Sequence, residues 1–250
     1  MTSIGFAALL FAAVLGTSFL SGIFGMAGGL ILMGILLAAL PVASAMALHA
    51  VTQMASNGWR AVLWRQYIHW PVFAWTLVGK LIALGGFALV QWVPSTATAY
   101  IVLGLVPFLV RPLPERLAPN ILRPGMPVLC GIVVQGLQLT CGVSGPTLDI
   151  FYVRSGLDRR VIVATKAATQ VVGHFVKLAY FTWLATAAVT AELELWLYAM
   201  AVATAIVGTT LARRVLEAMT DTTFMVWSQR IILALGAAYL GWGIWLSVSA

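Results

Sequence analysis

Charged residues are scarce in this sequence. Only 8% of its 250 residues are charged, whereas 62% are hydrophobic. A soluble domain of this length could not cover its surface with so few charges, and apolar runs of about 15 to 25 residues fill nearly the whole chain. The sequence therefore predicts an all-α fold of the polytopic helical membrane class.

The common signatures of membrane-embedded enzymes are also missing. The sequence has no His-Glu-x-x-His motif, no Gly-x-Ser-x-Gly motif and no pair of acidic residues within an apolar run. An intramembrane enzyme is therefore disfavoured, and we expect neither a cofactor nor a metal.

Cysteine is nearly absent as well. Cys130 and Cys141 lie in or near apolar segments and form neither a zinc pattern nor a disulfide framework, so we expect them to be small core residues. The first apolar run has no preceding basic residue and no clear cleavage site. We therefore expect it to belong to the mature protein rather than to a signal peptide.

Two glycine-containing breaks interrupt the apolar runs. Residues 22–29 contain four glycines and break the run that covers residues 4–40, and residues 140–146 break a later run. The stretch after the first break, residues 30–40, cannot cross a core of roughly 30 Å at about 1.5 Å per residue. We therefore expect broken or re-entrant helices near mid-membrane.

The breaks belong to a longer internal repeat. With an offset of 117 residues the two halves align without a gap, so that Gly25 pairs with Gly142 and Gly28 with Gly145. The same register also pairs Thr52 with Thr169, Gln53 with Gln170, and Arg60 with Lys177. We predict two inverted-topology repeats, residues 1–110 and 126–250, joined by a cytoplasmic linker of residues 111–125 that contains four prolines.

The basic residues predict the orientation in the membrane. We expect spans at residues 44–66, 71–93, 97–110, 126–139, 161–183, 194–211 and 231–248, with a polar stretch at 212–230. Each repeat then crosses an odd number of times, which places ten arginines on one side. By the positive-inside rule this side is cytoplasmic and both termini are periplasmic, as for a multi-pass protein of the bacterial inner membrane. The ten are Arg65, Arg111, Arg116, Arg123, Arg154, Arg159, Arg160, Arg213, Arg214 and Arg230.

Four basic residues remain inside apolar segments: Arg60, Lys80, Lys166 and Lys177. Asp149 is the only comparable acid. A basic residue at the bilayer centre costs roughly 2.5–3.5 kcal/mol on insertion scales, so these residues are functional candidates. Because the excess charge is positive, a cavity that they line would attract an anion and repel metal cations.

Helical spacing arranges these charges in two polar stripes, one on the span after each break. At equivalent positions of inverted repeats the stripes would face each other and, with the breaks, form an anion site. The members predicted from the first repeat are Gly25, Ala27, Gly28, Thr52, Gln53, Asn57 and Arg60. Those predicted from the second are Ser144, Gly145, Lys166, Thr169, Gln170, His174 and Lys177.

The breaks supply backbone donors to this site. Helices that resume at Leu30 and at Pro146 would point free N–H groups at an anion, and Gly28 and Gly145 would let it approach the backbone. Ser144 fits a helix cap whose hydroxyl could donate to a ligand oxygen.

Structural roles compete with these assignments. The buried basic residues could snorkel to the interface, and the Thr-Gln pairs and glycines could serve helix packing. Asp149 is expected in the first turn after the break, where it could form a salt bridge with a buried lysine. Alternatively, Asp149 and His49 could carry protons that are coupled to transport. Lys80 aligns with Leu197, so we expect a structural role for it.

The whole pattern resembles the sulfite exporter TauE/SafE family of membrane permeases. The residues that carry the resemblance are Gly22, Gly25, Gly28, Gly29, Pro41 and Thr52, repeated as Gly142, Gly145, Pro146 and Thr169. The resemblance implies an inner-membrane carrier for sulfite, organosulfonates or related sulfur-containing anions, often in the export direction. Ser144 and Pro146 stand where the first half has Ala27 and Gly29, which puts exact symmetry in doubt.

These observations predict a secondary transporter that moves a small oxyanion, sulfite or an organosulfonate, by alternating access. An anion channel, or a carrier of small carboxylates or other sulfur-containing anions, is the alternative. The expected partners are this anion, the lipid bilayer and, in a homodimer, a second copy of the chain. The formal net charge of +7 does not indicate nucleic acid, because the basic residues gather at one membrane face.

Overall fold

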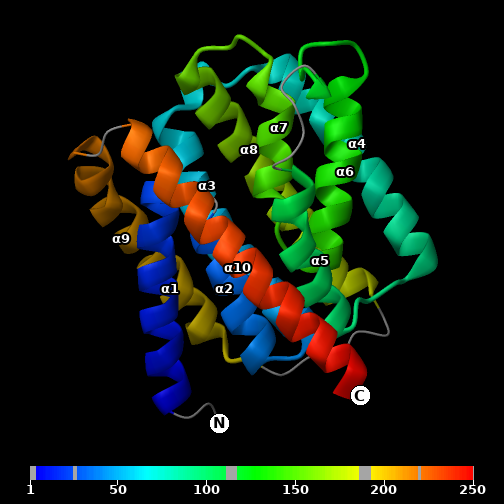
Figure 1. The fold of residues 1–250 in the computed structure, drawn as a ribbon, viewed down its shortest axis with the longest axis vertical. Coiled ribbons are helices and arrows are strands. Elements are labelled where there is room, and N and C mark those ends of the chain that lie inside the picture. Colours follow the sequence, from blue (N-terminus) through cyan, green and yellow to red (C-terminus); the bar gives the residue numbers. More distant parts are fainter. Residues whose placement is uncertain (1–3, 25–26, 111–116, 186–192, 219–220, 250) are drawn as a thin grey trace.

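The structure is a computed structural model that describes residues 4–24, 27–110, 117–185, 193–218 and 221–249. Every regular element in these ranges is a helix, so the all-α prediction is confirmed for them (Figure 1). The first half contains α1 (Ile4–Phe24), α2 (Ala27–Ala39), α3 (Val42–Leu63), η1 (Arg65–Tyr67), α4 (Trp70–Val90) and α5 (Thr96–Val110). The second half contains α6 (Met126–Cys141), α7 (Gly145–Val153), α8 (Arg159–Ala179), the π-helical turn η3 (Tyr180–Leu184), α9 (Leu195–Ala218) and α10 (Asp221–Ser249).

Four helices in the described ranges are long and apolar enough to cross a membrane, as expected for a multi-pass protein. These segments are Ile4–Ile23, Trp70–Val90, Leu195–Ala212 and Arg230–Ser249. Helices α3 and α8 have similar lengths, 22 and 21 residues, but their polar faces make them less apolar than these four. Their polar residues therefore need protein neighbours rather than lipid.

Helices α2 and α7 are much shorter. They contain 13 and 9 residues, so at about 1.5 Å per residue they extend about 20 and 14 Å. Pro146 lies in the first turn of α7, where its missing N–H has no helical partner to lose. Neither helix alone can cross an apolar core of roughly 30 Å.

Both breaks are narrower than the sequence suggested. Helix α1 continues to Phe24 and α2 begins at Ala27, whereas α6 ends at Cys141 and α7 begins at Gly145. The expected helix starts at Leu30 and Pro146 are therefore wrong by three residues and one residue. Glycines disfavour isolated helices, but in packed membrane helices they also allow close backbone approach.

The predicted polar stretch 212–230 is mostly helical in the described residues. Helix α9 extends to Ala218 and α10 begins at Asp221. Hydropathy falls where a helix leaves the apolar layer, although its backbone hydrogen bonds continue. Low hydropathy therefore does not mark the end of these helices.

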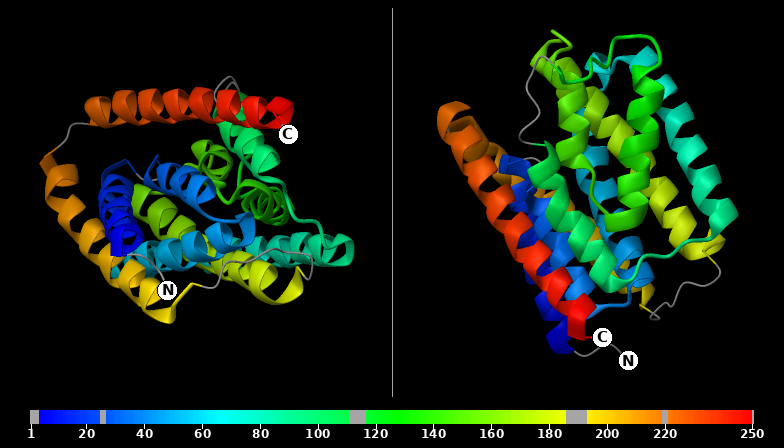
Figure 2. Two further views of the ribbon diagram at one scale, coloured as in Figure 1. Left: turned by 90° about the horizontal axis from the view of Figure 1, so that it is seen from below. Right: turned by 45° about the vertical axis from the view of Figure 1, so that its right-hand side comes forward.

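The two halves interlock in one bundle. Helix α1 packs against α9, α4 against α6, α3 against α8, and α5 against α10, so each of these contacts joins one half to the other. Figure 2 shows α1 beside α9 and α10 along an outer edge of the bundle. The polar helices α3 and α8 are consequently held against each other.

Two tyrosines fasten the short helix α2. The hydroxyl of Tyr100 in α5 donates to the carbonyl of Gly34 at 2.6 Å, and that of Tyr239 in α10 donates to the carbonyl of Leu30 at 3.2 Å. A Cβ atom on Gly34 would overlap the Tyr239 ring, so glycine is needed for this approach. Most α2 side chains are buried.

The start of α1 and the end of α10 lie at the same end of the bundle (Figure 1). The opposite end carries η1, residues 117–125 and the connection from α7 to α8. The predicted cytoplasmic arginines that lie there are Arg65, Arg123, Arg154, Arg159 and Arg160. Arg111 and Arg116 lie outside the described residues.

Candidate functional site

Lys177 and His49 join the two helix breaks in the interior of the bundle. Lys177 Nζ on α8 donates to His49 Nδ1 on α3 at 2.9 Å and to the carbonyl of Gly142 at 3.0 Å. Since Nδ1 accepts, the proton of a neutral His49 is on Nε2, which lies 2.9 Å from the carbonyl of Gly29 and donates to it. Gly29 is in the first turn of α2, and Gly142 caps α6.

The conformation of Gly142 explains why glycine occupies this cap. Its φ angle is +80°, in the left-handed region that other residues rarely adopt. A Cβ atom there would also press against the sulfur atoms of Met33 and Met46. Glycine at this position allows α6 to end with the Gly142 carbonyl directed at Lys177.

His174 and Ser144 offer hydrogen-bond donors without partners near this centre. The rings of His49 and His174 lie 5.5 Å apart, and Gln138 Nε2 is 3.4 Å from His174 Nε2. If the Gln138 amide donates there, the proton of His174 is on Nδ1, which has no partner among the described residues. The Ser144 hydroxyl, just before α7, is fully buried and likewise unpartnered. Buried donors of this kind can bond to a ligand or to water.

Lys80 is a second fully buried cation, with an exposed fraction of 1% against 0% for Lys177. Its Nζ donates to Gln135 Oε1 at 3.3 Å, and Gln135 Nε2 donates to the carbonyl of Gly173 at 3.2 Å. Gln138, one turn further along α6, donates separately from its Nε2 to Gln170 Oε1 at 3.1 Å. Polar side chains thus connect α4, α6 and α8 inside the bundle.

Sequence reasoning missed Gln135 and Gln138, which lie in a segment expected to be a plain apolar span. Both are fully buried. Their spacing of three residues puts them on one face of α6, and two amides on one face of an apolar run are the signal that could have identified them.

A separate polar cluster contains Arg60, Lys166 and Asp149. Lys166 forms an ion pair with Asp149, and Arg60 donates to the carbonyl of Ser21 at 3.4 Å. The charges of Arg60 and Lys166 are close enough to interact. The expectation of a buried acid in the first turn of its helix is wrong, because α7 starts at Gly145 and the Asp149 side chain is 37% exposed.

The geometry therefore describes a helical membrane protein that holds one buried cation, Lys177, between two helix breaks, with no carboxylate partner among the described residues. A family model described as "Sulfite exporter TauE/SafE" matches residues 9–240. The chain belongs to the TauE/SafE family. Membership places it among membrane transporters of sulfur-containing anions. Comparisons with curated proteins and with solved structures found no match.

Several polar residues predicted for the site of this TauE/SafE protein bond to their own helices. Thr52 Oγ1 donates to the Leu48 carbonyl and Thr169 Oγ1 to the Thr165 carbonyl, each at 2.9 Å. Asn57 Nδ2 donates to the Gln53 carbonyl, also at 2.9 Å. These contacts satisfy buried groups without a ligand.

The glycines of the two breaks differ in their surroundings. Gly28 packs so closely on α1 that a Cβ atom would overlap the carbonyl oxygen of Thr17, so its place in the structure serves helix packing. Ala27 and Gly145 are buried at the starts of α2 and α7. Gly25 lies outside the described residues.

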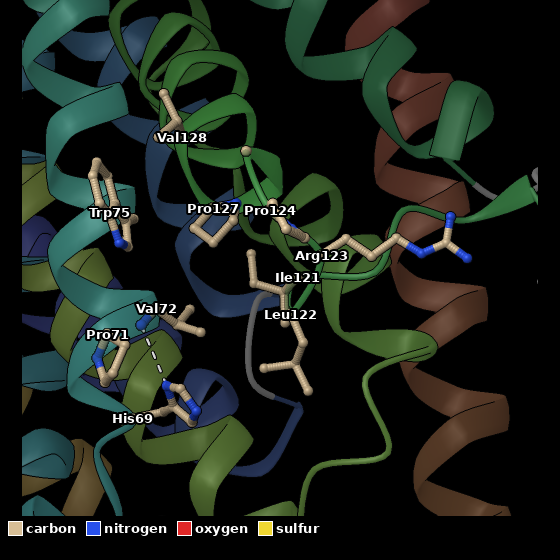
Figure 3. A pocket seen from close by; sticks show the side chains of 11 residues that line it. His69, Pro71, Val72, Trp75, Ile121, Leu122, Arg123, Pro124, Pro127 and Val128 are labelled. Carbon is tan, nitrogen blue, oxygen red and sulfur yellow. Dashed lines mark hydrogen bonds between the residues drawn. The ribbon is translucent and has the colours of Figure 1, made fainter.

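A pocket of about 420 Å³ opens at the arginine-rich end, between the start of α4, residues 121–125 and the start of α6 (Figure 3). Its lining is mostly apolar, and the Arg123 side chain points away from it. His69 Nδ1 accepts from the Val72 N–H at 3.3 Å and caps α4. Val72 lies eight residues before Lys80, about 12 Å along the helix, so this pocket is separate from the buried cations.

Proposed function

We propose that this TauE/SafE protein is a secondary transporter that exports a small oxyanion, sulfite or an organosulfonate, across the inner membrane. The observation that carries the proposal is the bridge from Gly29 through His49 and Lys177 to Gly142. It holds a fully buried ammonium between the two helix breaks. Membership of a transporter family supports a role without catalysis.

The surroundings of Lys177 favour an anion as its ligand. Its hydrogen-bond partners among the described residues, His49 Nδ1 and the Gly142 carbonyl, carry no negative charge. The unpartnered His174 Nδ1 and Ser144 Oγ add donors, and the starts of α2 and α7 add backbone N–H groups and positive dipole ends. The several oxygens of sulfite could accept from such donors at once.

The burial of the site supports a carrier rather than an open channel. His49, Ser144 and Lys177 are each at most 1% exposed. A channel needs a continuous water-filled path, whereas a carrier encloses its ligand between two access states. We therefore propose alternating access, in which the site opens to each side of the membrane in turn.

Helix packing supports the inverted-repeat part of this mechanism. If α1–α5 correspond in order to α6–α10, the contact of α1 with α9 corresponds to that of α6 with α4. Helices α3 and α5 pack on their own counterparts, α8 and α10. The offset of 117 residues also relates the pair His49–Lys177 to the pair Lys166–Arg60.

The membrane orientation follows from the arginine-rich end, which we propose to be cytoplasmic, with both termini periplasmic. Of the residues predicted from the sequence to bind substrate, we propose Lys177, His174 and Ser144 as the centre of the site. Asp149 and His49 remain proposed proton carriers. A homodimer remains a proposal.

Sulfite flux into proteoliposomes tests the function. We expect saturable flux that Lys177→Met lowers about tenfold or more, the scale of a charged hydrogen bond worth roughly 1.5–3 kcal/mol. Arg65→Met, which removes the same charge from an exposed position, is the matched control and should keep its flux. Equal flux in folded Lys177→Met would overturn the proposed site. Large unitary currents in bilayer recordings would overturn the carrier.

A further inference from the structure

We propose that Lys80 and Thr76 form a second anion subsite, separate from Lys177 and present on one side of the bundle only. The inference rests on the proposed anion transport and extends it. It assigns a binding role to a lysine whose position in the repeat suggested only a structural one.

Lys80 lies too deep in the structure to reach the membrane surface. It is the eleventh of the 21 residues of α4, so about 15 Å of helix separates it from either end. Its side chain is only 1% exposed. The ammonium is therefore enclosed by protein rather than placed at the interface.

No carboxylate in the described ranges neutralises Lys80. Among the described residues its hydrogen-bond partner is the uncharged amide of Gln135, and the buried thiol of Cys130 lies nearby. Six of the seven acidic residues lie at or beyond the ends of the apolar runs of the sequence, and the seventh, Asp149, pairs with Lys166. A buried charge without a partner is costly, so an anion from outside is the natural counter-charge.

A further donor lies on the same helix face as Lys80. A Cβ atom on Gly173 would overlap Gln138 Oε1 and crowd Lys80 Nζ, so the glycine lets the polar groups of α4 and α6 pack closely against α8. Thr76 lies one turn before Lys80 on the same helix face and is buried, and its hydroxyl has no partner among the residues that the structure describes. Gln135 holds the ammonium from one side and leaves its other N–H groups for an anion.

The second repeat-related helix pair carries no such subsite. In the 117-residue register Leu197 stands in place of Lys80 and Ser18 in place of Gln135, on the packed pair α9 and α1. The extra cation therefore makes the transport path asymmetric about the two breaks.

The Lys80 subsite is also close to the Lys177 centre. Gly173, which borders Lys80, precedes Lys177 by one helical turn, about 6 Å along α8. Two anions bound this near to each other repel, and such repulsion between adjacent sites helps a bound ion to leave. Lys80 would thereby raise the rate of anion release.

Counting bound sulfite tests the inference. In equilibrium dialysis of the purified full chain with ³⁵S-labelled sulfite, we expect two sulfites per chain for the wild type and for Arg65→Met. Lys80→Met, which keeps side-chain length and removes the charge, should bind one. Thermal unfolding without sulfite should show that Lys80→Met is folded, because an unpaired buried charge has been removed.

The outcomes separate this inference from the proposed function. If Lys80→Met binds two sulfites, the second subsite is overturned. It is also overturned if the wild type and Lys80→Met each bind one. Neither result contradicts the proposed transport function. No binding of sulfite or of an organosulfonate by the wild type would overturn both.

Discussion

Lys177 Nζ lies 2.9 Å from His49 Nδ1, so two residues 128 positions apart share a hydrogen bond inside the bundle. The other nitrogen of the same imidazole, Nε2, donates to the Gly29 carbonyl. His49 thus joins the cation of one half to the short helix of the other.

Replacing His49 should test its two hydrogen bonds. His49→Leu would leave Lys177 Nζ and the Gly29 carbonyl without this partner, and we expect a loss of about 1–3 kcal/mol in unfolding free energy, with lower sulfite flux. His49→Gln, whose amide can both donate and accept, should recover part of each. Denaturant unfolding and proteoliposome flux measure the two effects. Equal stability of both variants would contradict the bridging role.

Gly142→Ala should destabilise the second break. The left-handed φ of +80° and the nearby sulfur atoms of Met33 and Met46 both disfavour a side chain, so we expect a loss of about 1–3 kcal/mol. Gly136→Ala in the same helix is the control, since nothing lies within 4 Å of a Cβ atom there. Thermal unfolding of the two variants should therefore differ clearly. A similar melting temperature for both would argue against the constraint at Gly142.

Proton coupling is testable at Asp149. Asp149→Asn removes the titratable partner of Lys166, and we expect flux that varies with pH in the wild type to become independent of pH. Asp158→Asn provides the control, because Asp158 caps α8 through the Arg160 N–H and an asparagine can do the same. Flux measured across a range of pH values decides the matter. Unchanged pH dependence in Asp149→Asn would remove Asp149 as the proton carrier.

The proposed orientation can be checked by cysteine labelling. The native thiols Cys130 and Cys141 are buried and free, so they should not react with a membrane-impermeant maleimide in intact cells. Ser95→Cys, at the end that carries the termini, should be labelled from outside. Arg123→Cys, at the opposite end, should be labelled only after permeabilisation. The reverse pattern would invert the topology.

Sequence patterns predicted the fold more fully than they predicted the contacts between helices. Helical spacing predicted the polar faces of α3 and α8, which the structure shows as helices of 22 and 21 residues. These features depend on local chemistry, which neighbouring residues in the chain determine.

The contacts depend on how distant helices cover one another. A polar stripe does not reveal its neighbour, so the sequence could not show that His49 meets Lys177 rather than the aligned Lys166. Lys80 was assigned a structural role because its aligned residue is apolar. Its burial beside Gln135 depends on the packing of α4 on α6, which spacing within one helix does not specify.

The two tyrosines on α2 restrict how this protein can move. Tyr100 and Tyr239 come from different halves of the chain and bond to successive turns of α2. The helix cannot slide along its axis or rotate alone without losing both bonds. Any opening movement that separates α2 from α5 or from α10 must therefore break one of these hydrogen bonds, each worth about 1 kcal/mol.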